Sequence, residues 1–381
     1  MKNLNRYIVG MLVLVSIMGC TMEPIDENRL DFDFVKETPA AAEGILLNAY
    51  QGLVNQNVFS EAATDDAVNN QLNNSYKRIA NGQLTAQFNP ANRWGNYERV
   101  LWTNRFLEIL ESNETVWSSN EEVNQLFVER LKGEALALRG LHHFYILQAH
   151  AGKSSSGELL GVPYFSEFIE SDGNFNIPRL SFEATVTAIM KDFDDAIDLL
   201  PTDYTDNVNN IDAKYNVTEE EDIVNYQRVN GAQNNLRISG RIVRALKARL
   251  ALFAASPAFL NGQGNYYNVA ADNAAFIINL NGGVTSLAAN GDEFYTSDAG
   301  VQDDNELLWR SSIGGNSSAL EERMFPPSVN GRGEINPTQN LVDAFPMIDG
   351  TPIAESSSYD PQDPYTDRDP RLEKYIVLNG S

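Results

Sequence analysis

The sequence predicts a mainly α-helical protein: a tetratricopeptide-like scaffold of helical pairs, with long irregular loops and few short strands. Three observations indicate this fold class. Apolar residues recur at spacings of three and four along six segments, which is the pattern of one buried helix face. Alanines fall where paired helices would cross. The segments between the helices are long and rich in asparagine, glycine, serine and aspartate, so no clean repeat period is present.

Start and stop signals place the six helices. Thr38 followed by Pro39 predicts a helix start, because threonine caps a helix and proline is tolerated in its first turn. Ser181 predicts a second capped start. Pro201 and Pro257 each follow an apolar stripe and predict helix ends, since proline cannot continue a helix. The expected helices span residues 39–53, 94–110, 131–151, 182–200, 239–256 and 269–280.

The connecting loops make up the other half of the chain, and loops of such length predict either function or disorder. The 202–237 loop contains an acidic run and is expected to be partly disordered. Residues 306–310 (ELLWR) are expected to form a short strand. Trp94 and Trp309 lie on apolar faces of expected elements, so both are predicted to be in the core. The four long loops span residues 57–92, 153–180, 202–237 and 282–336.

Charge and cysteine content exclude several classes of site. The 28 Lys and Arg residues against 52 Asp and Glu residues give a net charge of −24, which repels nucleic-acid phosphates. Binding to nucleic acid is therefore not expected. The single cysteine cannot form a disulfide within the chain or a thiolate metal cage. The three histidines leave little material for a zinc site or a histidine-based catalytic relay.

The first residues are predicted to be a targeting signal. Lys2 and Arg6 form a basic region, and the apolar run over residues 7–19 is too short to span a bilayer. The run ends at Cys20 in a pattern that resembles a bacterial lipoprotein lipobox, so Cys20 is the predicted site of lipid attachment. The alternative is an ordinary signal peptide that happens to contain a cysteine. The predicted organisation is a lipoprotein signal peptide at 1–19, an acidic linker at 20–36 and a helical domain at 37–381.

Several separated motifs within residues 37–381 resemble the SusD/RagB family. Residues 133–145 (GEALALRGLHHFY) are similar to the family's AEA…LRA…YYF helix, and residues 161–163 (GVP) follow as in the family. Residues 337–345 (PTQNLVDAF) resemble its PT..LVD.F stretch, and residues 368–372 match its RDPRL motif. The motifs occur in the family's order. Because family members continue well beyond RDPRL, the chain is expected to be truncated at its C-terminus.

The resemblance implies a SusD-like fold and a function. Family members are nutrient-binding surface lipoproteins of Bacteroidetes, which implies non-enzymatic oligosaccharide binding and delivery to a SusC-like TonB-dependent outer-membrane transporter. Glu23, Asp26 and Glu27 after the cysteine resemble the export signal that places such lipoproteins on the outer face of the cell. A lipid-anchored protein in the outer membrane, facing the exterior, is therefore expected. A peptide cargo, as in some family members, and a helical-repeat adaptor without a ligand are alternatives.

Aromatic and amide side chains in the loops are the predicted ligand-binding residues. Sugars stack their C–H faces on aromatic rings and hydrogen-bond their hydroxyl groups to polar side chains, so a shallow site of this composition needs no catalytic group. The alternative for each residue is that it covers a helix end or fills a loop cluster. The predicted residues are Asn69, Asn73, Tyr76, Tyr266, Tyr267, Tyr295 and Phe325.

Paired carboxylates leave an enzyme as an alternative, because glycosidases place two carboxyl groups around the scissile bond. Asp65 and Asp66 lie in a loop, where they could bind a ligand or cap a turn. Asp194 and Asp195 are neighbours on a helix and do not face one another, so they are expected to be a solvated face. No catalytic residue is predicted, and a surface glycosidase using loop carboxylates remains the alternative.

Metal sites receive little support from the sequence. His142 and His143 are adjacent on a helix and point in different directions, so they are predicted to pack rather than to bind an ion. Oxygen ligands for calcium could come from four aspartates near the C-terminus, but prolines among them favour a turn-rich loop. No metal or other cofactor is therefore expected. These aspartates are Asp360, Asp363, Asp367 and Asp369.

Overall fold

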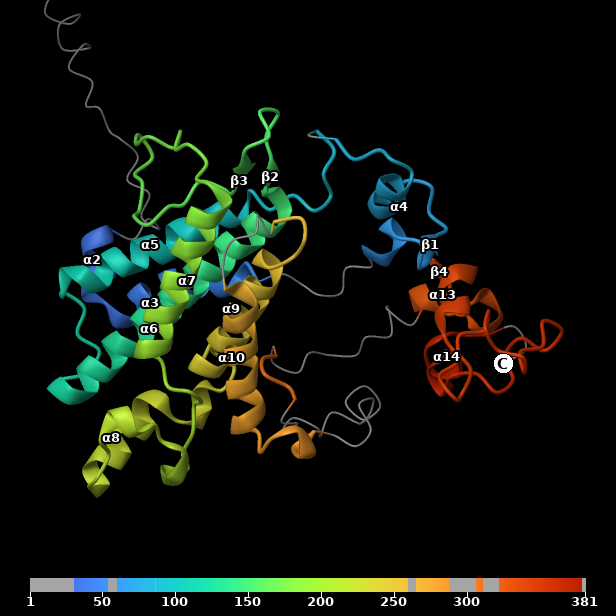
Figure 1. The fold of residues 1–381 in the computed structure, drawn as a ribbon. Coiled ribbons are helices and arrows are strands. Elements are labelled where there is room, and N and C mark those ends of the chain that lie inside the picture. Colours follow the sequence, from blue (N-terminus) through green and yellow to red (C-terminus); the bar gives the residue numbers. More distant parts are fainter. Residues whose placement is uncertain are drawn as a thin grey trace, which may run out of the picture.

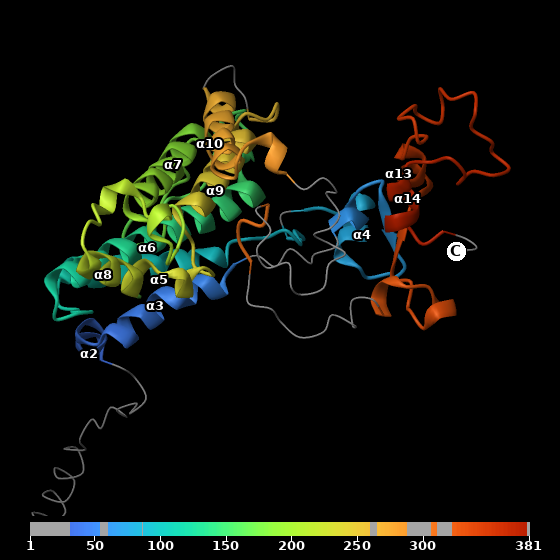
Figure 2. The same cartoon turned by 90° about the horizontal axis from the view of Figure 1, so that it is seen from below.

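The computed structural model describes residues 31–53, 60–85, 87–259, 265–287, 306–310 and 322–378. Most of them form one assembly of helices, here called the helical body. Residues 60–85 and 322–378 form a second group, here called the small lobe. The two groups lie apart in both views (Figures 1 and 2). The structure is helix-rich with short strands, as the sequence predicts.

The helical body contains all six predicted helices, now α3, α5, α6, α7, α9 and α10. α6 begins at Glu121 instead of Leu131, because the Asn120 side chain caps it by accepting the Val123 N–H at 3.1 Å. The predicted cap at Ser181 is confirmed, since its hydroxyl accepts the N–H of Ala184 at 3.1 Å. The helices of the body are α2 (Phe32–Glu37), α3 (Pro39–Gln51), α5 (Asn96–Ser112), α6 (Glu121–His150), α7 (Phe182–Leu199), α8 (Glu220–Asn230), α9 (Gly240–Ala254) and α10 (Tyr266–Leu280).

α6 is the central helix of the body. It packs against α5 and α7, while α9 packs against α7 and α10, and α3 packs against α5 (Figure 1). Leu131 and Leu138, in the predicted stripe of α6, are fully buried. Glycines let α7 approach closely, because a methyl group at Gly140 would lie 2.8 Å from the Phe193 ring. Helix pairing therefore depends on glycine at this crossing as well as on alanine.

Two predictions about the loops are wrong. Residues 202–237 were expected to be partly disordered, but they contain α8. The acidic run forms the capped first turn of that helix, where carboxylates are favourable, and Tyr226 on its inner face is buried. Residues 306–310 form no strand and belong to neither sheet of the part of the chain that the structure describes. Trp309 is partly buried against the core, and its indole N–H donates to the carbonyl of Leu236 at 2.9 Å.

The small lobe joins segments from distant parts of the chain. β1 (Ala67–Asn69) pairs antiparallel with β4 (Ile335–Pro337), and the Asn70 side chain donates to the carbonyl of Gly333 at 2.9 Å. A second two-stranded sheet, β2 (Gly152–Lys153) with β3 (Leu159–Leu160), is a hairpin on the helical body. The helices of the lobe are α4 (Ser75–Ala80), α13 (Gln339–Ala344) and α14 (Pro370–Tyr375) (Figure 2).

Arg368 of the RDPRL motif organises the C-terminal part of the small lobe. Its side chain is buried and donates to the carbonyls of Val342 (2.7 Å), Phe345 (2.6 Å) and Pro364 (2.8 Å). The next residue, Asp369, caps α14. The motif therefore connects the C-terminal end of α13 to the start of α14.

The end of the expected linker is helical. Residues 32–36 of the expected linker belong to α2, whose Lys36 pairs with Glu114 at 3.0 Å. The expected signal peptide and Cys20 lie outside the described residues. Among the helices that the structure describes, none combines the length and apolar character needed to cross a membrane.

Candidate functional site

A depression lined by aromatic residues beside the β2–β3 hairpin is here called the aromatic hollow. It has a volume of about 520 Å³ and lies between the hairpin, the start of α7, the segment after α9 and the start of α10. Its wall combines rings with charged groups, a composition that suits a polar ligand with apolar faces. The lining side chains that matter for the chemistry are Lys153, Glu158, Phe182, Glu183, Phe259 and Tyr266.

The rings of the hollow are fixed by core packing. Phe182 is the first residue of α7 and is buried, and its ring stacks on that of Phe259 with centroids 4.4 Å apart. Phe253 of α9 supports Phe259 at 4.7 Å. Tyr266 at the start of α10 is half-buried. Burial and the Glu183 carboxylate raise the pKa of Tyr266, so its hydroxyl stays protonated at neutral pH and can donate a hydrogen bond.

A second group of rings, here called the Trp94 platform, lies at the other end of the hairpin. Trp94 is 43% exposed, and its indole stacks on the ring of His150, the last residue of α6, with centroids 3.7 Å apart. Tyr97 lies nearly parallel to Trp94 at 5.9 Å. The prediction of Trp94 in the core is therefore wrong. Trp94 lies in the turn before α5. Its ring is therefore positioned by that turn and does not belong to the apolar face of the helix.

Arg179 connects the two ends of the β2–β3 hairpin, beside which the aromatic hollow and the Trp94 platform lie. Its guanidinium donates to the carbonyl of Gly161 after the hairpin (2.7 Å) and to that of His150 before it (2.8 Å). His150 of the platform and Lys153 of the hollow are three residues apart, at most roughly 11 Å of extended chain. The aromatic hollow and the Trp94 platform therefore both lie close to the hairpin. Sequence reasoning missed the platform, because no local pattern shows that Trp94 and His150 meet.

The helical body contains two of the predicted ligand residues. Tyr266 lines the hollow. Tyr267, its neighbour on α10, is 55% exposed and is not part of the lining. Adjacent residues on a helix point about 100° apart, which explains the difference.

The remaining described ligand candidates lie in the small lobe. Asn69 is 1% exposed, and its side chain accepts the N–H of Gln71 at 2.8 Å, so it acts as a turn residue here. Asn73 is exposed, Tyr76 on α4 is half-buried, and Phe325 is exposed. The seventh candidate, Tyr295, lies outside the described residues.

The structure does not bring Tyr76 and Tyr266 together. Tyr76 lies on α4, which packs against residues 60–63, and the preceding β1 pairs with β4, so the segment belongs to the small lobe. α4 and α10 lie apart in both views (Figures 1 and 2). A ligand site that joins the first loop to α10 is therefore not formed by the described residues.

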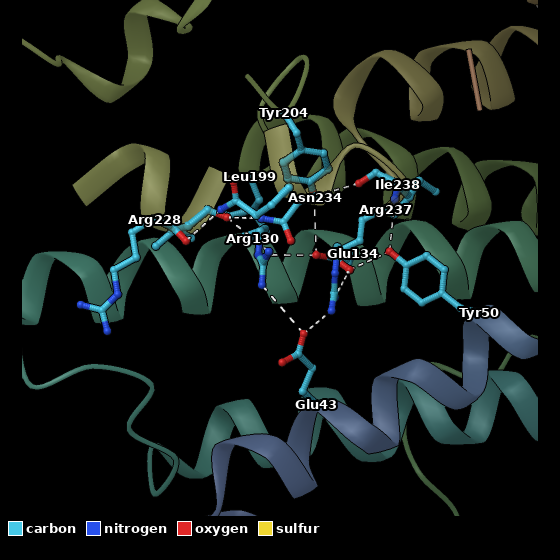
Figure 3. Close-up of polar contacts among 12 residues, drawn as sticks. Glu43, Tyr50, Arg130, Glu134, Leu199, Tyr204, Arg228, Asn234, Arg237 and Ile238 are labelled. Atoms are coloured by element: carbon cyan, nitrogen blue, oxygen red, sulfur yellow. Dashed lines mark hydrogen bonds and ion pairs between the residues drawn. The ribbon is translucent and has the colours of Figure 1, made fainter. Parts of the chain in front are cut away.

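A buried cluster of charges beside the core is structural. Glu134 of α6 is fully buried and accepts from Tyr50 of α3 at 2.6 Å and from Arg237 at 3.0 Å (Figure 3). Arg237 also pairs with Glu43 of α3, and Arg130 lies 3.6 Å from Glu134. Two carboxylates thus face two guanidinium groups, and burial raises the pKa of Tyr50 well above its ordinary value. The cluster joins α3, α6 and the segment before α9.

The carboxylates considered for catalysis occupy exposed positions. Asp194 pairs with Lys247 of α9, and Asp195 pairs with Lys191 one turn away at 2.5 Å, which confirms a solvated helix face. Asp65 and Asp66 precede β1 and are exposed. Their backbone carbonyls, rather than their carboxylates, accept hydrogen bonds from Thr338.

The adjacent histidines of α6 pack in the core, as predicted. Both are fully buried, and burial lowers the pKa of His142 to about 4 and that of His143 to about 3. His142 hydrogen-bonds the carbonyl of Ala49, while His143 bonds the carbonyl of Arg139 and accepts the N–H of Phe165. The Nδ1 of His142 also lies 3.0 Å from the side-chain amide nitrogen of Asn96, so these contacts occupy all four ring nitrogens that a metal would need.

The C-terminal aspartates serve turns and a helix cap. Asp360 accepts the N–H of Gln362, Asp363 accepts from the hydroxyl of Thr366, and Asp369 caps α14. Within the ranges that the structure describes, no cluster of three or more His, Cys, Asp and Glu side chains could hold a metal ion. The expectation that no cofactor is needed stays a prediction.

Two family models match the chain. One, described as SusD-like and as starch-binding associating with outer membrane, matches residues 31–216, and the SusD family model matches residues 298–381. Together they cover more than half of the sequence. The chain belongs to the SusD/RagB family. This confirms the resemblance. No match was found among curated proteins.

Solved SusD-like structures share the fold. A SusD-like protein from Bacteroides fragilis is 19% identical, with a TM-score of 0.66 over 94% of this chain and 64% of that one. A SusD-like carbohydrate-binding protein from the same species is 20% identical, with a TM-score of 0.61 over 89% of this chain and 59% of that one. At such identities the likeness shows the fold alone. The chain spans less than two thirds of the length of either relative.

Proposed function

We propose that this SusD/RagB protein binds oligosaccharide at the cell surface and delivers it to a SusC-like TonB-dependent transporter in the outer membrane. Cys20 would carry the lipid anchor, and the protein would face the cell exterior. Family membership supports this proposal, as does the family description of starch binding and association with the outer membrane. The fold is shared with a protein described as carbohydrate-binding.

The observation that carries the proposal is the composition of the aromatic hollow. Tyr266 and Phe259 offer ring surface for the C–H faces of a sugar, and Glu158 and Glu183 offer acceptors for its hydroxyl groups. The Trp94 platform adds a second exposed ring at the other end of the hairpin. The site is open and preformed, which suits capture of a chain-like ligand without chemical change.

Calorimetry or affinity electrophoresis on a panel of neutral oligosaccharides tests the proposal. Tyr266→Leu should weaken binding by about 1–3 kcal/mol, by analogy with the loss of one base–aromatic stack. Tyr266→Phe should retain most of the affinity, because the ring remains. Tyr267→Leu is the matched control on the same helix and should bind like the wild type. Equal losses at both positions would contradict the hollow as the site.

Product analysis on the same panel separates a binder from the enzymatic alternative. A surface glycosidase using loop carboxylates would shorten the polymer, whereas a binding protein retards it without shortening it. Failure of the wild type to bind any oligosaccharide would favour a peptide cargo or a ligand-free adaptor. Fractionation of Cys20→Ala tests the anchor, since loss of acylation should release the protein from the membrane.

A further inference from the structure

The Trp94 platform is held by a histidine ring in one protonation state. His150 lies under the Trp94 indole with an angle of 8° between the ring planes. Its Nε2 accepts the backbone N–H of Arg93 at 3.1 Å. A ring nitrogen that accepts a hydrogen bond carries no proton, so this contact exists only while the imidazole is neutral.

The surroundings favour the neutral ring. Partial burial lowers the pKa of His150, and the positive charge of Arg179, which donates to the carbonyl of His150, lowers it further. Other ionisable residues near this stack in the sequence are Arg93 before α5, Tyr97, Glu98 and Arg99 on α5, Tyr145 on α6 and Lys153 on β2. The C-terminal end of α6 acts in the opposite direction, because the helix dipole stabilises a positive charge there.

We propose that His150 makes sugar binding at the Trp94 platform dependent on pH. Neutral His150 holds the Arg93 amide and keeps the Trp94 ring stacked over the end of α6. A proton from solvent on Nε2 replaces the acceptor by a donor, breaks the contact with Arg93 and releases the turn that carries Trp94. The inference rests on the proposed function, because it assigns Trp94 a role in stacking on sugar.

The direction of the effect follows from the state that binds. Neutral His150 is the binding form, so affinity is complete above the ordinary histidine pKa of about 6.5 and falls as the pH drops through the lower value of His150. One hydrogen bond contributes about 1 kcal/mol net, which corresponds to roughly a fivefold loss of affinity.

The fluorescence of Trp94 tests, without any ligand, whether protonation of His150 moves the Trp94 ring. An indole that leaves a stacked ring and becomes more exposed to water emits at a longer wavelength, and subtraction of the Trp94→Phe spectrum removes the other tryptophans. The emission maximum of the difference spectrum should move to longer wavelength between pH 7.5 and 4.5 in the wild type. It should stay constant in His150→Gln, whose side-chain oxygen can still accept the Arg93 N–H without titrating. A constant wild-type maximum, or an equal shift in His150→Gln, would overturn the proposal.

Affinity measurements at two pH values then test whether protonation of His150 weakens oligosaccharide binding. An oligosaccharide that binds the wild type at pH 7.5 should bind more weakly at pH 5, by up to roughly fivefold, whereas His150→Gln should show no such loss. Circular dichroism at both pH values confirms that each variant is folded. Equal losses in both proteins would also overturn the proposal. If the wild type binds no oligosaccharide, the proposed function fails, while the fluorescence titration still decides whether His150 controls the platform.

Discussion

The helical body and the small lobe are held together in different ways. The helical body has a large apolar core, in which Phe106, Phe144 and Phe193 are fully buried. The described part of the small lobe depends on backbone pairing between segments far apart in the sequence, such as the Asn70 N–H, which donates to the carbonyl of Glu334 at 2.8 Å. Its buried apolar side chains are few: Ala62, Ala67, Val342, Met347 and Leu372.

This difference indicates where the molecule opens most easily. Segments with few buried apolar contacts and solvent-exposed hydrogen bonds open at low free-energy cost. Val68 and Leu72 in the small lobe are exposed, and Arg368 supplies much of the order around α13 and α14. We therefore expect the helical body to resist changes at its surface and the small lobe to respond to the loss of single hydrogen-bonding side chains.

The largest effect is expected in the core of the helical body. Leu138→Ala should lower the free energy of unfolding by about 2–5 kcal/mol, because it leaves a cavity in the fully buried stripe of α6. Leu252 on α9 is 58% exposed, and Leu252→Ala should change stability by less than about 0.5 kcal/mol. Urea unfolding measures both. Similar losses at the two positions would contradict the register of the helices.

Acid should weaken the helical body more than the small lobe. Burial lowers the pKa of His142 to about 4 and that of His143 to about 3, so the folded state keeps both neutral. The unfolded chain binds their protons below pH 6.5 or so, and stability that is complete above this value is lost as the pH falls from there toward 4. At pH 5 each histidine should cost about 2 kcal/mol.

Hydrogen exchange at pH 7 and 5 checks this contrast. All three histidines lie in the helical body, so the small lobe has no such contribution. After correction for the intrinsic exchange rate, amides of α6 should lose protection at pH 5. Amides of β1 and β4 should lose much less. An equal loss in both regions would show that carboxylates, rather than the buried histidines, dominate the response to acid.

The small lobe should depend on Arg368. Arg368→Met removes the donors to three backbone carbonyls and should cost about 1–3 kcal/mol of local stability. The expected readout is loss of exchange protection in α13 and α14, with an unchanged unfolding midpoint for the helical body. Arg371, which is exposed and pairs with Asp369, provides the control Arg371→Met. Unfolding of the whole chain by Arg368→Met would show that the two regions are one cooperative unit.

Sugar binding should distinguish the two regions as well. Tyr266→Leu in the aromatic hollow is expected to cost about 1–3 kcal/mol of binding free energy. Tyr76→Leu in the small lobe should cost less than half a kcal/mol or so if the hollow is the main site, because non-contacting residues couple weakly. Calorimetry on the same oligosaccharide measures both. A larger loss at Tyr76 would move the site to the small lobe, where the sequence also places Asn73 and Phe325.

The smallest effect is expected from removal of metal ions. The C-terminal aspartates are engaged in turns and in the cap of α14, so EDTA should leave both sugar affinity and thermal stability unchanged. Addition of calcium after EDTA is the control. A gain of stability with calcium would contradict the assignment of these aspartates to structural turns.

The helical body could be predicted from the sequence to a large extent. Helical hydrogen bonds join residues four apart, so apolar spacing and caps such as Ser181 contain most of the information about where a helix runs. Burial of Leu138 and the packing role of His142 were predicted from such local patterns. The prediction of partial disorder for residues 202–237 was wrong, because the acidic residues before Tyr226 form the capped start of α8.

The small lobe and the candidate site depended on contacts that no local pattern contains. The sequence identified Tyr266 as a ligand candidate and RDPRL as a motif, and it established the charge, the single cysteine and the helical class. Only the tertiary structure decided that Tyr266 faces a hollow while Tyr267 does not, that Trp94 meets His150, and that β1 pairs with β4. The reason is physical: these contacts join groups that are distant in the chain, and their geometry follows from packing of the whole helical body.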